Sequence, residues 1–191
     1  MIPIEYLWLT VILVFAIIGM GRGLWKELGA TTVLLLSLFA LHLGEELILN
    51  KLTGSLPAST TSAFPEGTVR AAYYSVSIVF IAFIAYQGVT LEFPVKKQKG
   101  VFKWVFGYLG GLVNGYLTVG TVWNVLSDAK YLGISVPMGS NGTKIAVSGN
   151  LTKLHDSIVQ ALPVALMNSN SFVPYLILAL GMILLLAIIL K

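Results

Sequence analysis

The amino-acid sequence predicts an all-α membrane protein: a single domain with about five membrane-spanning helices and one interfacial amphipathic helix. Hydrophobic residues make up 57% of its 191 residues and charged residues only 10%, whereas a soluble domain carries about 25% charged residues. The apolar runs are long enough to cross a hydrocarbon core of about 30 Å as helices. Lys and Arg residues fall in short loops between these runs, which is the pattern of a protein with a fixed membrane orientation.

The first predicted span covers residues 3–20, an almost unbroken apolar run with Tyr6 and Trp8 near its start. Aromatic rings of this kind suit the membrane interface. The run lacks the basic start and the small-residue cleavage site of a signal peptide, so we expect it to be retained.

A tight polar turn is expected after this span, at residues 19–29. Gly19 and Gly23 lie four positions apart, and the basic Arg22 precedes the acidic Glu27. Glu27 can pair with Arg22, with Lys26 or with charges on another loop. We interpret the segment as a cytoplasmic turn whose positive charges set the orientation. The alternative is that Arg22 and Glu27 bind a partner or gate the protein.

The second predicted span covers residues 28–43 and the third covers residues 71–91, with a connection rich in Ser, Thr, Pro and Gly between them. His42 ends the second span, and His155 is the only other histidine. The chain contains no cysteine. The sequence therefore predicts no metal site and no cofactor.

The most basic stretch is the loop at residues 92–103. The positive-inside rule places this loop in the cytoplasm, and the same charges favour contact with anionic lipid headgroups. Lysines in so short a loop beside a span do not predict nucleic-acid binding. The four lysines are Lys96, Lys97, Lys99 and Lys103.

The fourth predicted span covers residues 101–126 and carries a repeated glycine. Gly107, Gly111 and Gly115 recur at every fourth position, so they share one helical face. Without Cβ atoms, this face lets another helix approach closely in lipid. Asn114 lies beside the glycines as a polar group. We interpret the face as a helix-packing surface; the alternative is a groove or pore wall with Asn114 as its polar contact.

Two further elements complete the predicted domain. Apolar residues of segment 150–167 fall on one helical face, which predicts an amphipathic helix that lies in the interface or caps the bundle, with Asn150 as its N-cap. Pro163 should kink or end this helix. The fifth predicted span covers residues 171–190.

Counting spans between basic loops predicts the orientation. The loops at residues 19–29 and 92–103 are both basic and short, and an even number of predicted spans separates them. Both loops can therefore face the cytoplasm. The sequence predicts an external N-terminus and a cytoplasmic C-terminus.

The sequence resembles one known family. The segment from Gly19 through Arg22 and Gly23 to Glu27 resembles the Gly-x-x-Arg-Gly-x-x-x-Glu signature of the CvpA family, the colicin V production proteins. The glycine-rich fourth span and the amphipathic segment resemble the corresponding parts of that family, so the resemblance covers roughly residues 1–167. The fifth span has no counterpart in the usual four-span member. The resemblance implies a bacterial inner-membrane protein linked to colicin export or envelope upkeep.

The function predicted from these features is non-enzymatic. No nucleophile–base pair, metal-ligand cluster or phosphate-binding loop is visible in the residue spacing. Helix-packing faces and a capping amphipathic helix favour an accessory or structural subunit that contacts other membrane subunits. The alternative is a homo-oligomeric channel or envelope-export component, with a pore lined by Asn114, Thr118 and Thr121.

Overall fold

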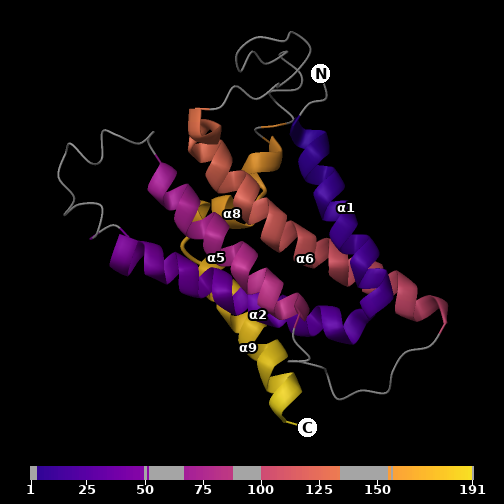
Figure 1. Ribbon diagram of the computed structural model, residues 1–191. Coiled ribbons are helices and arrows are strands. Elements are labelled where there is room, and N and C mark those ends of the chain that lie inside the picture. The colour runs from indigo at the N-terminus through magenta and orange to yellow at the C-terminus, as the bar shows by residue number, and fades with distance from the viewer. Residues whose placement is uncertain are drawn as a thin grey trace.

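The computed structural model describes residues 4–49, 51, 67–87, 100–133, 155 and 157–190, and all regular structure within these ranges is helical (Figure 1). A π-helical turn, η1, extends the second helix, and a 3₁₀ turn, η2, follows the longest helix, α6. The elements are α1 (Ile4–Arg22), α2 (Leu24–Gly44), η1 (Glu45–Leu49), α5 (Thr68–Gln87), α6 (Val101–Asp128), η2 (Lys130–Gly133), α8 (Pro163–Ser169) and α9 (Val173–Ile189).

Among the described residues, three helices are long and apolar enough to cross a membrane: α1, α2 with its extension to Leu47, and α5. The predicted fourth and fifth spans differ from these three. Helix α6 has 28 residues, but its glycines and polar side chains dilute its hydrophobicity. Helix α9 is strongly apolar but has only 17 residues.

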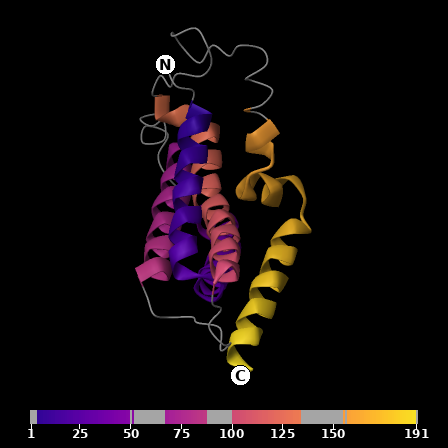
Figure 2. The ribbon, with the colours of Figure 1, turned by 90° about the vertical axis from the view of Figure 1, so that its right-hand side faces the viewer.

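Helix α6 is the central element of the fold. It contacts α1, α2, α5 and α8, while α9 packs against α2. Figure 2 shows α1, α5 and α6 running side by side, with α9 at the edge of the bundle. The largest apolar cluster joins α2, α5 and α6 around fully buried side chains, among them Leu34, Leu38, Tyr74 and Ile78. Helices α2, α5 and α6 therefore bury their apolar faces against one another, and α1 packs on α6 through glycines.

The turn between α1 and α2 is much shorter than the predicted turn at residues 19–29. Helix α1 continues to Arg22 and α2 begins at Leu24, so the chain turns at Gly23, whose φ is +84°. Glycine adopts this left-handed conformation without a Cβ clash. The backbone hydrogen bonds continue across the turn, from the Gly23 N–H to the Gly19 carbonyl at 2.8 Å and from the Glu27 N–H to the Gly23 carbonyl at 3.2 Å. The assignment of Gly19 and Glu27 to a loop is therefore wrong: both lie inside helices.

The predicted single helix at residues 150–167 is also wrong in its continuity. Its first residues, 150–154 and 156, lie outside the described residues. The helical turn at 157–160 ends just before Pro163, and Pro163 then begins α8. Proline suits a first helical position because its missing N–H would have no intrahelical acceptor there. Leu162, Val164 and Met167 are buried, and α8 packs on α6.

Candidate functional site

Helices α1 and α6 meet through the glycines of both. A Cβ atom at Gly107 would overlap the carbonyl oxygen of Gly19, and a Cβ at Gly111 would overlap that of Phe15. At Gly115 a Cβ would lie 2.9 Å from the Cβ of Phe15. The predicted packing face thus lies against α1 backbone, where no larger side chain fits. The distance between the two helices is set by the absence of side chains.

Next to this contact, four helices contribute polar side chains to one buried group. We call it the arginine–glutamate cluster: Arg22 of α1, Glu27 and Thr31 of α2, Tyr86 of α5 and Asn114 of α6. Glu27 and Asn114 are both 0% exposed. Glu27 fits against α6 at Gly110, where a Cβ would approach the Glu27 Cβ to 2.7 Å. A buried carboxylate is costly unless it is paired and hydrogen-bonded.

The Glu27 carboxylate has three partners. Its Oε1 lies 2.8 Å from Arg22 Nε in an ion pair that lacks the angle of a hydrogen bond. Its Oε2 accepts hydrogen bonds from the Tyr86 hydroxyl at 2.7 Å and from Asn114 Nδ2 at 2.7 Å. The Asn114 Nδ2 also lies 3.0 Å from the Glu27 carbonyl oxygen. The negative charge is therefore compensated by one cation and two donors.

The rest of the cluster is held to the backbone. The Thr31 hydroxyl lies 2.8 Å from the Glu27 carbonyl and 2.7 Å from Asn114 Oδ1. Arg22 donates through Nη1 to the Tyr86 carbonyl at 2.6 Å, and its guanidinium stands 4.3 Å from the centre of the Tyr86 ring. A cation over an aromatic ring contributes about 0.5–2 kcal/mol. The segment predicted as a polar turn therefore links α1, α2, α5 and α6 through hydrogen bonds and an ion pair.

The three residues predicted to line an oligomeric pore are buried within a single copy of the chain. Asn114 and Thr121 are 0% exposed and Thr118 is 4% exposed. The Thr121 hydroxyl donates to the Leu117 carbonyl at 2.6 Å. A pore shared between copies needs its lining at the surface, so this lining is not supported.

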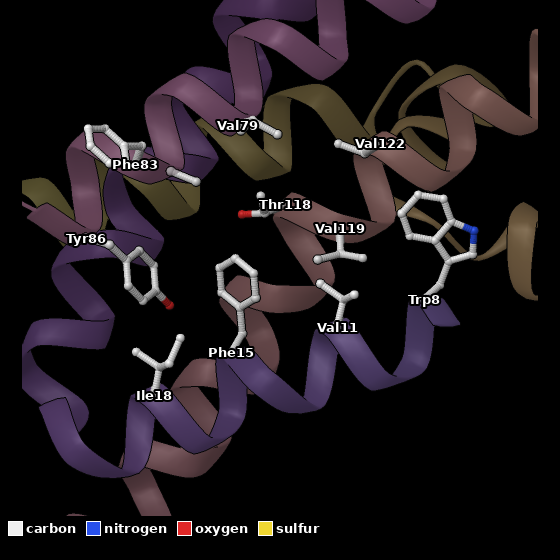
Figure 3. A pocket seen from close by; sticks show the side chains of 11 residues that line it. Trp8, Val11, Phe15, Ile18, Val79, Phe83, Tyr86, Thr118, Val119 and Val122 are labelled. Atoms are coloured by element: carbon white, nitrogen blue, oxygen red, sulfur yellow. The ribbon is translucent and has the colours of Figure 1, made fainter. Parts of the chain in front are cut away.

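An apolar groove of about 410 Å³ opens between α1 and α5, with α6 as its floor. Figure 3 shows Trp8, Phe15 and Ile18 of α1 along one side and Phe83 and Tyr86 of α5 on the other. Tyr86 belongs both to this groove and to the arginine–glutamate cluster. The groove is within the size range of small-molecule sites.

At the other end of α1, a second polar group forms that the sequence did not predict. His155 Nδ1 lies 3.1 Å from Glu5 Oε1, and His155 Nε2 lies 3.3 Å from Ser127 Oγ. We call these residues the Glu5–His155–Ser127 chain. Glu5 and His155 are 4% and 7% exposed, whereas Ser127 is half-buried.

Aromatic side chains surround the Glu5–His155–Ser127 chain. Trp123 is fully buried, its ring lies 6.0 Å from those of Trp8 and His155, and its Nε1 donates to the Tyr131 hydroxyl at 3.2 Å. Burial raises the pKa of the Tyr131 phenol, so this hydroxyl stays protonated. Lys130 and Tyr131 have φ values of +48° and +51°. Two consecutive left-handed residues that are not glycine are strained, and such strain is concentrated at functional sites.

A third polar group joins α5 to the ends of two other helices. Arg70 Nε lies 2.6 Å from Glu45 Oε1, and Arg70 Nη1 lies 2.8 Å from Asp128 Oδ2. The Tyr74 hydroxyl donates to Glu45 Oε2 at 2.7 Å. The Asp128 side chain is 46% exposed. This group is more open to solvent than the other two.

Most of the lysines predicted to contact lipid headgroups are not among the described residues. Lys96, Lys97 and Lys99 lie outside the described residues. Lys103 lies in the first turn of α6, and a Cβ at Gly23 would lie 3.2 Å from its Cε. Its aliphatic chain therefore runs past the turn between α1 and α2.

His42 lies 3.7 Å from Glu46. Within the described ranges no three His, Cys, Asp or Glu residues gather as metal ligands.

Sequence reasoning missed the partners of two residues that it singled out and one whole group. Glu27 and Asn114 were both noted, but 87 positions separate them and nothing in the spacing joins them. Glu5 carried a usable signal, because an ionisable residue inside an apolar span requires a partner. Ser127 and His155 lie in polar stretches in which no periodicity marks them.

These observations define a helical protein with apolar helices long enough for a membrane and with polar groups buried between them. Comparison with family models, with curated proteins and with solved structures found no match.

Proposed function

We propose that this chain is a multi-pass protein of a bacterial inner membrane, related to the CvpA family, that acts as an accessory or structural subunit of a larger membrane complex. In this proposal α6 and α9 cross the membrane together with α1, α2 and α5. The N-terminus is external and the C-terminus is cytoplasmic.

The arginine–glutamate cluster is the observation that carries this proposal. A transporter keeps its intramembrane polar groups on a pathway that its substrate can reach. Here Glu27 and Asn114 are fully buried and bound to other side chains of the same bundle. The polar groups thus serve to join helices, which is what a packing subunit requires.

The outward faces of the helices support the same proposal. Ile17 of α1, Phe80 of α5 and Ile183 of α9 are each more than 60% exposed. Apolar faces of this kind fit either lipid tails or the helices of another membrane subunit.

Purification from native membranes in a mild detergent, followed by mass analysis, tests the proposal. Recovery at fixed stoichiometry with other membrane subunits is the expected result. Recovery as a homo-oligomer alone would contradict it and favour the channel or export component. Phe80→Ser should release the partners without loss of thermal stability. Ile78→Ser, at a fully buried position on the same helix, should unfold the bundle instead.

The orientation has its own test, because the chain contains no cysteine. Single cysteines introduced at Lys97 and at Lys191 should both react with a membrane-impermeant maleimide only from the cytoplasmic side. Labelling of either position from outside the cell contradicts the proposed orientation.

A further inference from the structure

The Glu5–His155–Ser127 chain places a carboxylate, an imidazole and a hydroxyl in the order that activates a serine. An ionised carboxylate can only accept hydrogen bonds, so the 3.1 Å contact to Glu5 places the imidazole proton on Nδ1. The opposite nitrogen, Nε2, is then free to accept the proton of Ser127, whose Oγ lies 3.3 Å away. This tautomer is the one that general-base catalysis by histidine requires.

The three residues of the Glu5–His155–Ser127 chain differ in burial, and a catalytic serine requires this difference. Glu5 and His155 are more than nine-tenths buried, so the imidazole is held in place, while Ser127 remains half-exposed to an incoming molecule. Trp8, three residues after Glu5 on α1, and Ser127 both interact with the Tyr131 hydroxyl, so the phenol of Tyr131 lies beside the proposed nucleophile.

The apolar groove gives the class of substrate. Trp8 lines the groove and its ring lies 6.0 Å from that of Trp123, which in turn lies 6.0 Å from the His155 ring. One end of the groove therefore lies beside the aromatic side chains that surround the imidazole. Its volume of about 410 Å³ and its apolar lining fit a hydrocarbon chain. Ile18 and Phe83 at its edge are exposed, which gives such a chain access from the bilayer.

We infer that Ser127 is the nucleophile of a hydrolase site for long-chain acyl esters, with His155 as general base and Glu5 as the residue that orients it. This inference goes beyond the proposed function and does not depend on it. It replaces the expectation, drawn from residue spacing, that the chain is not an enzyme.

The reaction follows from the positions of the groups. Ser127 Oγ bonds to the ester carbonyl carbon while its proton passes to His155 Nε2. The bond to the alcohol oxygen then breaks, and His155 returns the proton to the leaving alkoxide. Water then attacks the acyl carbon while His155 takes one of its protons, the bond from the acyl carbon to Ser127 Oγ breaks, and His155 returns the proton to Oγ. The products are a carboxylic acid and an alcohol.

The full-length protein in detergent, treated with a fluorophosphonate probe, tests the inference directly. The expected result is a single covalent adduct, which peptide mass spectrometry locates on Ser127. An unlabelled wild-type protein, or an adduct located on a different residue, overturns the inference. Neither result depends on the folding of a variant.

Variants test the roles of the individual residues with p-nitrophenyl palmitate and p-nitrophenyl butyrate as substrates. Ser127→Ala should abolish hydrolysis and labelling, and His155→Ala should lower kcat by about 10²- to 10⁴-fold. Ser169→Ala is the matched control, because Ser169 is exposed and donates to the Leu166 carbonyl outside this site; it should retain full activity. Equal hydrolysis by wild type and Ser127→Ala overturns the inference.

Glu5 acts through His155, so its test separates binding from catalysis. Glu5→Gln should lower kcat while the KM for the palmitate ester stays within about twofold, because the carboxylate touches the imidazole and not the substrate. A rise in KM with unchanged kcat would contradict the orienting role. Faster hydrolysis of the butyrate ester than of the palmitate ester would contradict the proposed acyl groove.

Discussion

The arginine–glutamate cluster and the Glu5–His155–Ser127 chain lie at opposite ends of α1, and their polar atoms are paired to different extents. In the first, Glu27 is fully buried and both of its carboxylate oxygens contact a cation or a hydrogen-bond donor. In the second, only one Glu5 oxygen, Oε1, has a contact, the 3.1 Å one to His155 Nδ1, and Oε2 is buried without a hydrogen-bond partner among the described residues. We call the Arg22 end of α1 the closed end, because both Glu27 oxygens have partners there, and the Glu5 end the open end, because one Glu5 oxygen has none.

This difference separates two uses of buried polarity. A buried carboxylate with a partner at each oxygen favours one helix arrangement over its alternatives, and Glu27 has such partners even though its contact with Arg22 Nε is an ion pair and not a hydrogen bond. A network with unpaired atoms is less stable, but it leaves donors and acceptors available to a bound molecule. Among the described residues, backbone strain at positions other than glycine also lies at the open end, at Lys130 and Tyr131. We therefore expect variants at the closed end to affect stability and variants at the open end to affect chemistry.

The largest loss of stability is expected from Glu27→Gln. The substitution leaves the Arg22 guanidinium beside a neutral amide in the packed interior, and breaking a buried ion pair in this way costs about 3–5 kcal/mol. The melting temperature in detergent measures the effect. Glu46→Gln is the control, because the Glu46 side chain is 62% exposed. Equal melting temperatures for the two variants would contradict a stabilising role for the cluster.

Gly111→Leu should follow in size. Its side chain would overlap the Phe15 backbone, so α1 must move away from α6, and overpacking of this kind costs about 1–3 kcal/mol. Gly21→Leu is the control, since a Cβ at Gly21 meets nothing within 4 Å. Unchanged assembly and melting temperature in Gly111→Leu would show that the glycine face is not a packing contact.

Ser127→Ala should change the melting temperature only slightly, although it removes the proposed nucleophile. The hydroxyl is half-buried, lies 3.3 Å from His155 Nε2 and also interacts with the Tyr131 hydroxyl, so its loss costs about 0.5–1.5 kcal/mol. A destabilisation as large as that of Glu27→Gln would mean that the open end is a structural network like the closed one.

The smallest effect is expected from Asp128→Asn. Arg70 keeps its 2.6 Å contact with Glu45, and the Asp128 side chain is 46% exposed, so the lost ion pair contributes about 0.2–1 kcal/mol. The difference in melting temperature between variant and wild type should shrink further at high salt. A salt-independent difference would show that Asp128 acts other than through its charge.

The sequence predicted elements better than it predicted contacts. Hydropathy located the apolar helices, and the four-residue spacing identified the face formed by Gly107, Gly111 and Gly115. Neither signal could name α1 as the facing helix, because the partner at Gly19 is a single small residue in a long apolar run.

The errors at Glu27 and at residues 150–167 have related causes. A carboxylate beside glycines is typical of a loop, and the sequence pattern cannot show that Asn114 and Tyr86 donate hydrogen bonds to Glu27 inside the bundle. Apolar periodicity across Pro163 reads as one helix, since the periodicity does not reveal where a backbone break falls. The Glu5–His155–Ser127 chain depends on residues 150 positions apart, which only the fold brings together.

The glycine contact between α1 and α6 also has a consequence for biosynthesis. Gly19 faces Gly107, so the surface that α1 needs is synthesised long after α1 itself. At about 5–20 residues per second, a ribosome takes roughly 4–18 s to extend the chain between these positions. During that interval α1 carries the Glu5 carboxylate and a bare glycine face without their final partners. The newly made chain therefore exposes the glycine face of α1 until α6 has been synthesised.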